Sequence, residues 1–86
     1  MPLEWSALWN AMDAAPAEWI PTTPAMHDEM LGAVPPRAMA RGAFLVGEPA
    51  RHDSDGRAVY ACFRRIGDSF AARYMTHAEF SEWSRA

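Results

Sequence analysis

Lysine is missing from this chain, and cysteine occurs only once among its 86 residues. All eight basic residues are therefore arginines. Guanidinium groups favour bidentate and stacked contacts, and arginine is enriched at protein interfaces, although a GC-rich genome would give the same bias without selection at any surface. The lone Cys62 has no partner for an internal disulfide, which agrees with a reducing compartment; the expectation of a cytoplasmic protein rests on the lack of a signal peptide.

Long apolar segments are missing as well. No run approaches the roughly 18 apolar residues that a membrane span needs, and the segment from Met1 to Trp5 lacks the basic region and apolar core of a signal peptide. Half of the residues are hydrophobic and 22% are charged, which is a globular composition. The net charge of -3 marks neither a nucleic-acid binder nor a mimic of double-stranded DNA. The length predicts one domain, residues 1–86, without membrane association.

Metal-binding and catalytic motifs are also absent. The sequence has no Gly-x-Ser-x-Gly, no glycine-rich phosphate loop and no paired cysteines. His52, Asp53 and Asp55 resemble the opening of a calcium loop, but an EF-hand needs ligands over about twelve residues and a terminal Glu. His27 lacks the second histidine one turn on that a zincin helix requires. We therefore predict no metal, no cofactor and no enzymatic activity.

One catalytic alternative stays open. Cys62 could act as a nucleophile with His27, His52 or His77 as its base, because such partners meet in space rather than in sequence. A buried structural thiol in a strand is the commoner case.

The clearest structural pattern lies between Ala58 and Phe80. Two alternating segments meet at Gly67-Asp68, which we interpret as the centre of a tight hairpin. This interpretation fixes the register, in which Ile66 faces Ser69, Arg64 faces Ala71, Cys62 faces Arg73 and Tyr60 faces Met75. The two faces of the hairpin follow from that register.

The first face of the hairpin is apolar and is the predicted core side, because side chains alternate along a strand. It collects Val59, Ala61, Phe63, Phe70, Ala72 and Tyr74. The second face is half polar and collects Tyr60, Cys62, Arg64, Ile66, Ala71, Arg73 and Met75. Arg64 and Arg73 are diagonal neighbours there, so they repel each other unless an anionic group lies between them. This face is either a solvated outer face or a partner-binding surface.

The predicted helices lie at both ends of the chain. Residues 3–14 carry an apolar stripe that includes Trp5 and Trp9, which could serve as core or as partner anchors. After an extended connection, Thr23-Pro24 opens a second helix that stops near Gly32. Thr76 and Glu79 fit a capping box before a short C-terminal helix, with Phe80 and Trp83 on one face.

The predicted strands follow the second helix. A short helical turn is expected over residues 38–40, then a strand over residues 43–46. Asp53-Ser54-Asp55-Gly56 is a strong turn, so this strand returns as the antiparallel neighbour of the next one. The expected fold is α+β, a three-stranded antiparallel meander with two N-terminal helices and one short C-terminal helix.

A family resemblance covers about two thirds of the chain. Its residues are His27, Met30, Pro35-Pro36, the run Gly42 to Pro49, His52, Gly56, Tyr60, Phe63 and the run Met75 to Phe80. In these residues the chain resembles small domain-of-unknown-function proteins of plasmids and prophages in Gram-negative bacteria. The resemblance implies a mobile genetic element and an inhibitor of host defence, such as an anti-CRISPR protein that occludes the surface of a Cas subunit.

Two sets of residues could bind such a partner. Asp53, Asp55 and Asp68 would matter against a basic nucleic-acid channel. Tyr60, Arg64 and Arg73 would matter against an acidic or nucleic-acid partner, in the style of a sheet that binds single strands. The alternatives to an inhibitor are a nucleic-acid-binding or regulatory module, and a small structural homo-oligomer that pairs through a sheet face or edge.

Overall fold

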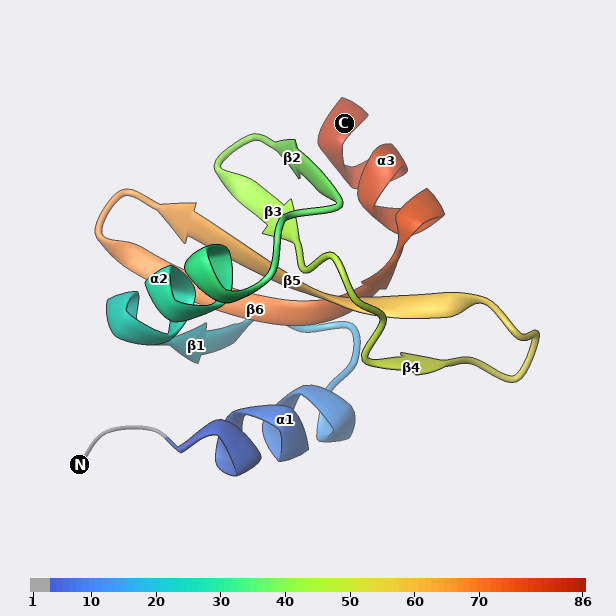
Figure 1. The fold of residues 1–86 in the computed structure, drawn as a ribbon, viewed down its shortest axis with the longest axis horizontal. Helices are drawn as coiled ribbons and strands as arrows, with labels where there is room; N and C mark the ends of the chain where they lie inside the picture. The colour runs from blue at the N-terminus through green and yellow to red at the C-terminus, as the bar shows by residue number, and fades with distance from the viewer. Residues whose placement is uncertain (1–3) are drawn as a thin grey trace.

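The structure is a computed structural model that describes residues 4–86 (Figure 1). Part of the expected first helix, at Leu3, and part of the segment inspected for a signal peptide lie outside these residues. Along the chain the elements are α1 (Trp5–Ala14), β1 (Ile20–Thr22), α2 (Pro24–Ala33), β2 (Ala38–Ala40), β3 (Ala43–Leu45), β4 (Arg51–His52), β5 (Ala58–Ile66), β6 (Ser69–Thr76) and α3 (His77–Arg85). The α+β class and the placement of the three helices agree with the sequence. Among the described helices, none has the length and apolar character that a membrane span requires.

Strand β5 is the centre of the sheet. It pairs with β6 from Val59 to Ile66, and its other edge is shared by β3 and β4. The described strands form a six-stranded antiparallel sheet of order β1-β6-β5-β3-β2, with β4 beside β5. The prediction of a three-stranded meander was therefore wrong in extent. Strands β3, β5 and β6 form the middle of the observed sheet, and the short strands β1, β2 and β4 extend the sheet beyond the predicted three.

The long hairpin has the predicted register. Ile66 pairs with Ser69, and the pairing continues without a bulge to Val59 and Thr76. Gly67 has a φ of 58°, and Asp68 is not among the residues of positive φ. This combination is the two-residue turn with glycine at its first central position, whose twist matches that of the flanking strands.

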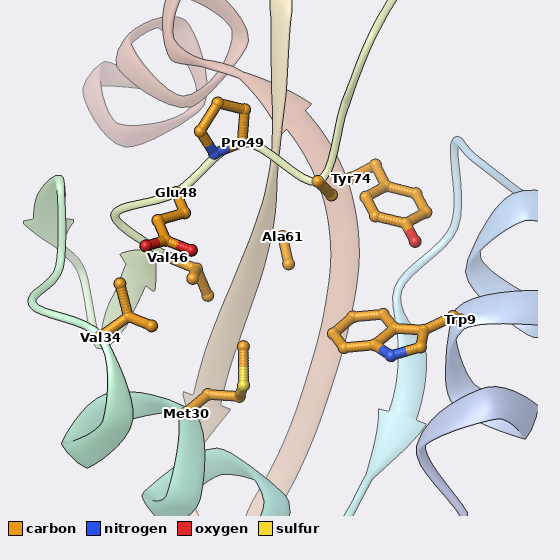
Figure 2. Close-up of a pocket in the computed structure, with 9 residues that line it drawn as sticks. Trp9, Met30, Val34, Val46, Glu48, Pro49, Ala61 and Tyr74 are labelled. Atoms are coloured by element: carbon orange, nitrogen blue, oxygen red, sulfur yellow. The ribbon is translucent and has the colours of Figure 1, made fainter.

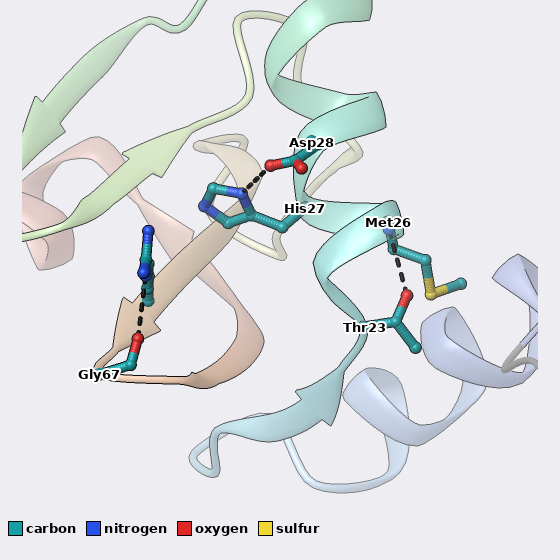
Figure 3. Close-up of polar contacts among 6 residues, drawn as sticks. Thr23, Met26, His27, Asp28 and Gly67 are labelled. Carbon is teal, nitrogen blue, oxygen red and sulfur yellow. Dashed lines mark hydrogen bonds and ion pairs between the residues drawn. The ribbon is translucent and has the colours of Figure 1, made fainter.

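Both predicted helix caps are present. The side-chain oxygen of Thr23 accepts a hydrogen bond from the backbone N–H of Met26 at 3.1 Å, and Pro24 is the first residue of α2 (Figure 3). The Thr76 hydroxyl accepts from the Glu79 backbone at 3.1 Å, and the Glu79 side chain accepts from the Thr76 backbone at 2.8 Å. This reciprocal capping box starts α3 directly at the end of β6.

The helical turn predicted over residues 38–40 was wrong. Ala38–Ala40 is strand β2, which pairs with β3 through a turn at Arg41 and Gly42, whose φ angles are 53° and 74°. Alanine and methionine favour helices locally, but pairing with a neighbouring strand overrides that preference. The extended connection predicted before Thr23 contains β1, an edge strand with Pro21 at its middle.

Each face of the sheet carries a hydrophobic core. On the first face, α1 and α2 pack against the side chains that the register predicted, including Phe63, Ala72 and Tyr74. Trp5 and Trp9 stack with centroids 5.5 Å apart, and each meets Phe63 edge to face. They are thus part of the packing of α1 on the sheet.

The second face is covered by α3, which lies across the sheet from α1 (Figure 1). The buried side chains of this second core are Ala43, Leu45, Tyr60, Cys62 and Met75 from the sheet and Phe80 from α3, with Trp19 and Trp83 packed against them. The interpretation of this face as a solvated outer surface was therefore wrong. The apolar stripe of α3 and the ring of Trp19 remove most of it from water.

Candidate arginine and tryptophan binding face

Two tryptophans from distant segments meet at the rim of the second core. Trp19 precedes β1, and Trp83 comes from α3. The register that pairs Ile20 with Ala72 places Trp19 beside Arg73 on the α3 side of the sheet. The two indole rings lie 5.5 Å apart between centroids and are tilted by 53°. They form a half-buried aromatic pair next to Arg64 and Arg73.

Three arginines lie over these two rings. The guanidinium carbon of Arg64 is 5.3 Å from the Trp19 centroid and 5.0 Å from that of Trp83. Arg73 is 5.7 Å from Trp19, and Arg41 is 5.7 Å from Trp83. These distances are within the range of cation–π contacts. We call this cluster of Trp19, Arg41, Arg64, Arg73 and Trp83 the arginine–tryptophan face.

The rings do not complete the hydrogen bonding of these guanidiniums. The Nε atoms of Arg64 and Arg73 are buried and have no hydrogen-bond partner in the described structure. Within residues 4–86, no carboxylate lies within 4.0 Å of either group, whereas Arg51 and Arg57 do have carboxylate neighbours. Arg41 donates only to backbone oxygens, those of Trp83 and Ala86. The diagonal pair predicted to need an anion between its members is thus present without one.

Tyr60 lies on the predicted side of the sheet, with Arg64 and Arg73, but its ring is not exposed for stacking as predicted. Its exposed fraction is 6%, and its ring belongs to the second core. The guanidinium of Arg37 covers the ring at 5.0 Å. The prediction failed because Tyr60 is next to the point where α3 begins to cross the sheet.

Cys62 lies beneath the arginine–tryptophan face and is fully buried. Burial raises the pKa of its thiol to about 12, against the opposing influence of Arg73 and Arg64. His27, which projects from α2 (Figure 3), is on the other face of the sheet, and its ring contacts those of Phe44 and Phe70. No hydrogen bond joins Cys62 to a histidine in the described residues, so the cysteine–histidine alternative gains no geometric support.

The three predicted acidic residues do not form one surface. Asp53 accepts hydrogen bonds from the backbone N–H groups of Asp55 and Arg57, both at 2.9 Å, as a turn aspartate does. Asp55 is exposed at the same turn. Asp68 is in the β5–β6 turn, at the opposite end of β5 (Figure 1). Within residues 4–86, no group of three or more acidic, histidine or cysteine side chains could hold a metal ion.

Comparison with protein-family models, with curated proteins and with solved structures finds no significant match. The resemblance to small proteins of plasmids and prophages therefore stays a prediction.

The sequence interpretation included Arg64 and Arg73 but missed Trp19, Trp83 and Arg41. Phe80 and Trp83 were expected on one apolar face of the last helix. Such a face must pack against something, and the second face of the hairpin carries an apolar set that no other predicted element covers. That argument would have indicated a second core. It would not have placed Trp19, whose position depends on the pairing of β1 with β6.

Proposed function

We propose that this chain is a binding protein whose arginine–tryptophan face captures carboxylates on the acidic surface of a protein partner. The observation that carries the proposal is the state of Arg64 and Arg73, whose guanidiniums lie over tryptophan rings and have no carboxylate of residues 4–86 within 4.0 Å. A guanidinium presents its donors in a fixed fork that matches a carboxylate with two parallel hydrogen bonds. The rings reduce the side-chain entropy lost on binding, because they already hold the guanidiniums in place.

A carboxylate partner fits this face better than a single-stranded nucleic acid. Recognition of single strands uses free aromatic faces on which bases stack. Here Arg64 and Arg73 already lie over Trp19, and the Tyr60 ring is buried. What the face offers is a few oriented donors rather than a stacking platform.

The inhibitor predicted from the family resemblance is a finer form of the same proposal. A small protein that binds an acidic patch of a Cas subunit, in the cytoplasm, would block whatever that patch recruits. The donor-rich face supports such a role, and the choice of a host-defence complex rests on the resemblance alone.

Homo-oligomer formation through a sheet face is disfavoured, because helices cover both faces. Only sheet edges remain for pairing. The β1 edge carries Pro21, which cannot donate to a ladder, and β2 has only three residues.

The test compares matched pairs of arginine substitutions. Arg64→Met with Arg73→Met removes two charges from the face, and Arg57→Met with Arg85→Met removes two exposed charges elsewhere. Each variant is titrated, by fluorescence anisotropy, with a glutamate-rich peptide and with a single-stranded oligonucleotide of equal charge. We expect the unmodified chain and the control to bind the peptide more tightly, and the Arg64 and Arg73 variant to lose that binding. Oligonucleotide binding as tight as peptide binding would contradict the proposal.

A pull-down then addresses the partner. The tagged chain and the same two variants are incubated with lysate from bacteria that express a CRISPR–Cas system, and captured proteins are identified by mass spectrometry. Recovery of a Cas subunit by the unmodified chain and the control, but not by the Arg64 and Arg73 variant, is the expected result for an inhibitor. Equal recovery by all three would place the contact elsewhere.

A further inference from the structure

A pocket of about 450 Å³ opens on the first face of the sheet, away from the arginine–tryptophan face. Its wall residues come from α1, α2, the segment after β3, and the strands β5 and β6. Figure 2 shows Trp9 and Tyr74 on one side and Met30, Val34, Val46 and Glu48 on the other. A cavity of this volume with mainly apolar walls and few polar groups is typical of small-molecule sites.

The pocket exists because a small side chain forms its floor. Ala61 lies between the two walls, whereas its neighbours on the same face of β5 are Val59 and Phe63. Helices α1 and α2 pack on either side without filling the space above Ala61. The packing of the first core therefore leaves room for a ligand between two secondary-structure layers.

Glu48 is the one charged residue of the described pocket wall. Within residues 4–86, no basic side chain lies within 4.0 Å of its carboxylate. The nearest candidate in sequence, Arg51, instead pairs with Asp13 of α1 and lies 4.5 Å from the Tyr74 ring centroid. The guanidinium of Arg51 at the rim is thus paired with the Asp13 carboxylate, whereas the Glu48 carboxylate has no basic neighbour in the described residues.

Across the pocket from Glu48 are two aromatic rings. Trp9 and Tyr74 are stacked, with centroids 6.3 Å apart and planes 21° from parallel. Because the guanidinium of Arg51 already lies over the Tyr74 ring, we take the two rings as an apolar aromatic wall of the pocket and not as a cation site. Burial, with a contribution from Asp13, raises the pKa of the Tyr74 phenol above its ordinary value, so this ring stays neutral at physiological pH.

From this geometry we propose that the pocket binds a small hydrophobic amine in its ammonium form. The apolar part of the ligand occupies the space over Ala61, between Met30 and Trp9. The ammonium group lies beside the Glu48 carboxylate, and the Trp9 and Tyr74 rings form the apolar wall on the opposite side of the pocket. This site is independent of the proposed function of the opposite face.

The experiment compares 4-phenylbutylamine with 4-phenylbutanol, two probes of similar shape that differ in charge. Binding to the full chain is measured by calorimetry, and its location by NMR shifts of the Ala61 methyl and Trp9 indole signals. At low salt we expect the amine to bind roughly threefold to fivefold more tightly than the alcohol, from one partly exposed ion pair with Glu48. Raising the salt concentration should reduce this preference.

Two single substitutions complete the test. Glu48→Gln should abolish the preference for the amine and leave the affinity of the alcohol unchanged, whereas Glu82→Gln, on the surface of α3, should change neither. Equal affinity of both probes, or an amine preference that survives Glu48→Gln, would overturn the proposal. So would shifts at Trp19 and Trp83 in place of Ala61 and Trp9, or no binding of either probe at millimolar concentration.

Discussion

Replacing Arg64 by methionine separates the role of its guanidinium in binding from its role in folding. Methionine keeps an unbranched apolar stem that can pack on the Trp19 and Trp83 rings, and it removes the charge and the buried Nε donor. If the guanidinium is present for a partner, its removal should cost the folded chain little.

Two opposing contributions determine how much Arg64→Met changes the free energy of unfolding. A buried donor without a partner costs about 1–3 kcal/mol, and Arg64 Nε is such a donor. The contacts of the guanidinium with the two rings contribute about 0.5–2 kcal/mol, and solvent at this half-buried position screens them toward the lower value. We therefore expect Arg64→Met to lower the free energy of unfolding by no more than about 1 kcal/mol, or to raise it.

Urea unfolding monitored by circular dichroism measures this difference without relying on tryptophan fluorescence, which the substitution itself perturbs. Arg57→Met, at an exposed position, is the matched control and should change little. Arg64→Ala also removes the apolar stem and should cost more than Arg64→Met. A loss above about 2 kcal/mol for Arg64→Met, with an unchanged slope, would show that the guanidinium mainly stabilises the fold and would refute the reasoning.

Other substitutions test the fold and its buried thiol. Gly47→Ala should destabilise by more than about 2 kcal/mol, because its Cβ would lie 2.2 Å from a backbone oxygen, while Gly32→Ala, with nothing within 4 Å, should stabilise by about 0.5–1 kcal/mol; thermal unfolding of both compares them. Thr76→Ala and Glu79→Ala should each cost about 1 kcal/mol, and the double variant should cost less than their sum, since the two hydrogen bonds form one capping box. Cys62 should resist iodoacetamide at pH 8 until the chain unfolds. Above pH 9 the free energy of unfolding should fall, because the unfolded thiol ionises near 9 whereas the folded thiol keeps its proton until about pH 12; a flat pH dependence between these values would contradict the burial argument.

Local patterns predicted the local parts of this fold. The turn at Gly67-Asp68 fixed every pair of the long hairpin, because a side-chain period of two leaves a single register that places the apolar set on one face. The helix caps at Thr23 and Thr76 could also be predicted from the sequence, since each cap depends on two residues within three positions of each other.

The sequence did not predict the strand pairings of β2 and β1. Ala38–Ala40 has no strand preference of its own and is a strand because it pairs with β3. The turn between the two strands, at Arg41 and Gly42, lacks the Asn-Gly or Asp-Gly pair that usually marks such a hairpin. Trp19 reached the second face only because β1 adds to the edge of β6. The candidate site was therefore half predicted, in its two strand arginines, and half missed, in the aromatic rings that hold them.

The position of β5 determines how this small protein can move. Its edges are paired with β3, β4 and β6, and its two faces support both cores. Its buried residues, Val59 to Phe63, cannot open without breaking the sheet and exposing apolar side chains on both sides, so their amide hydrogens should exchange only through global unfolding. Local fluctuation is left to the hairpin ends and the short outer strands. Any partner of either face therefore meets a preformed surface, and association should proceed with little rearrangement of the backbone.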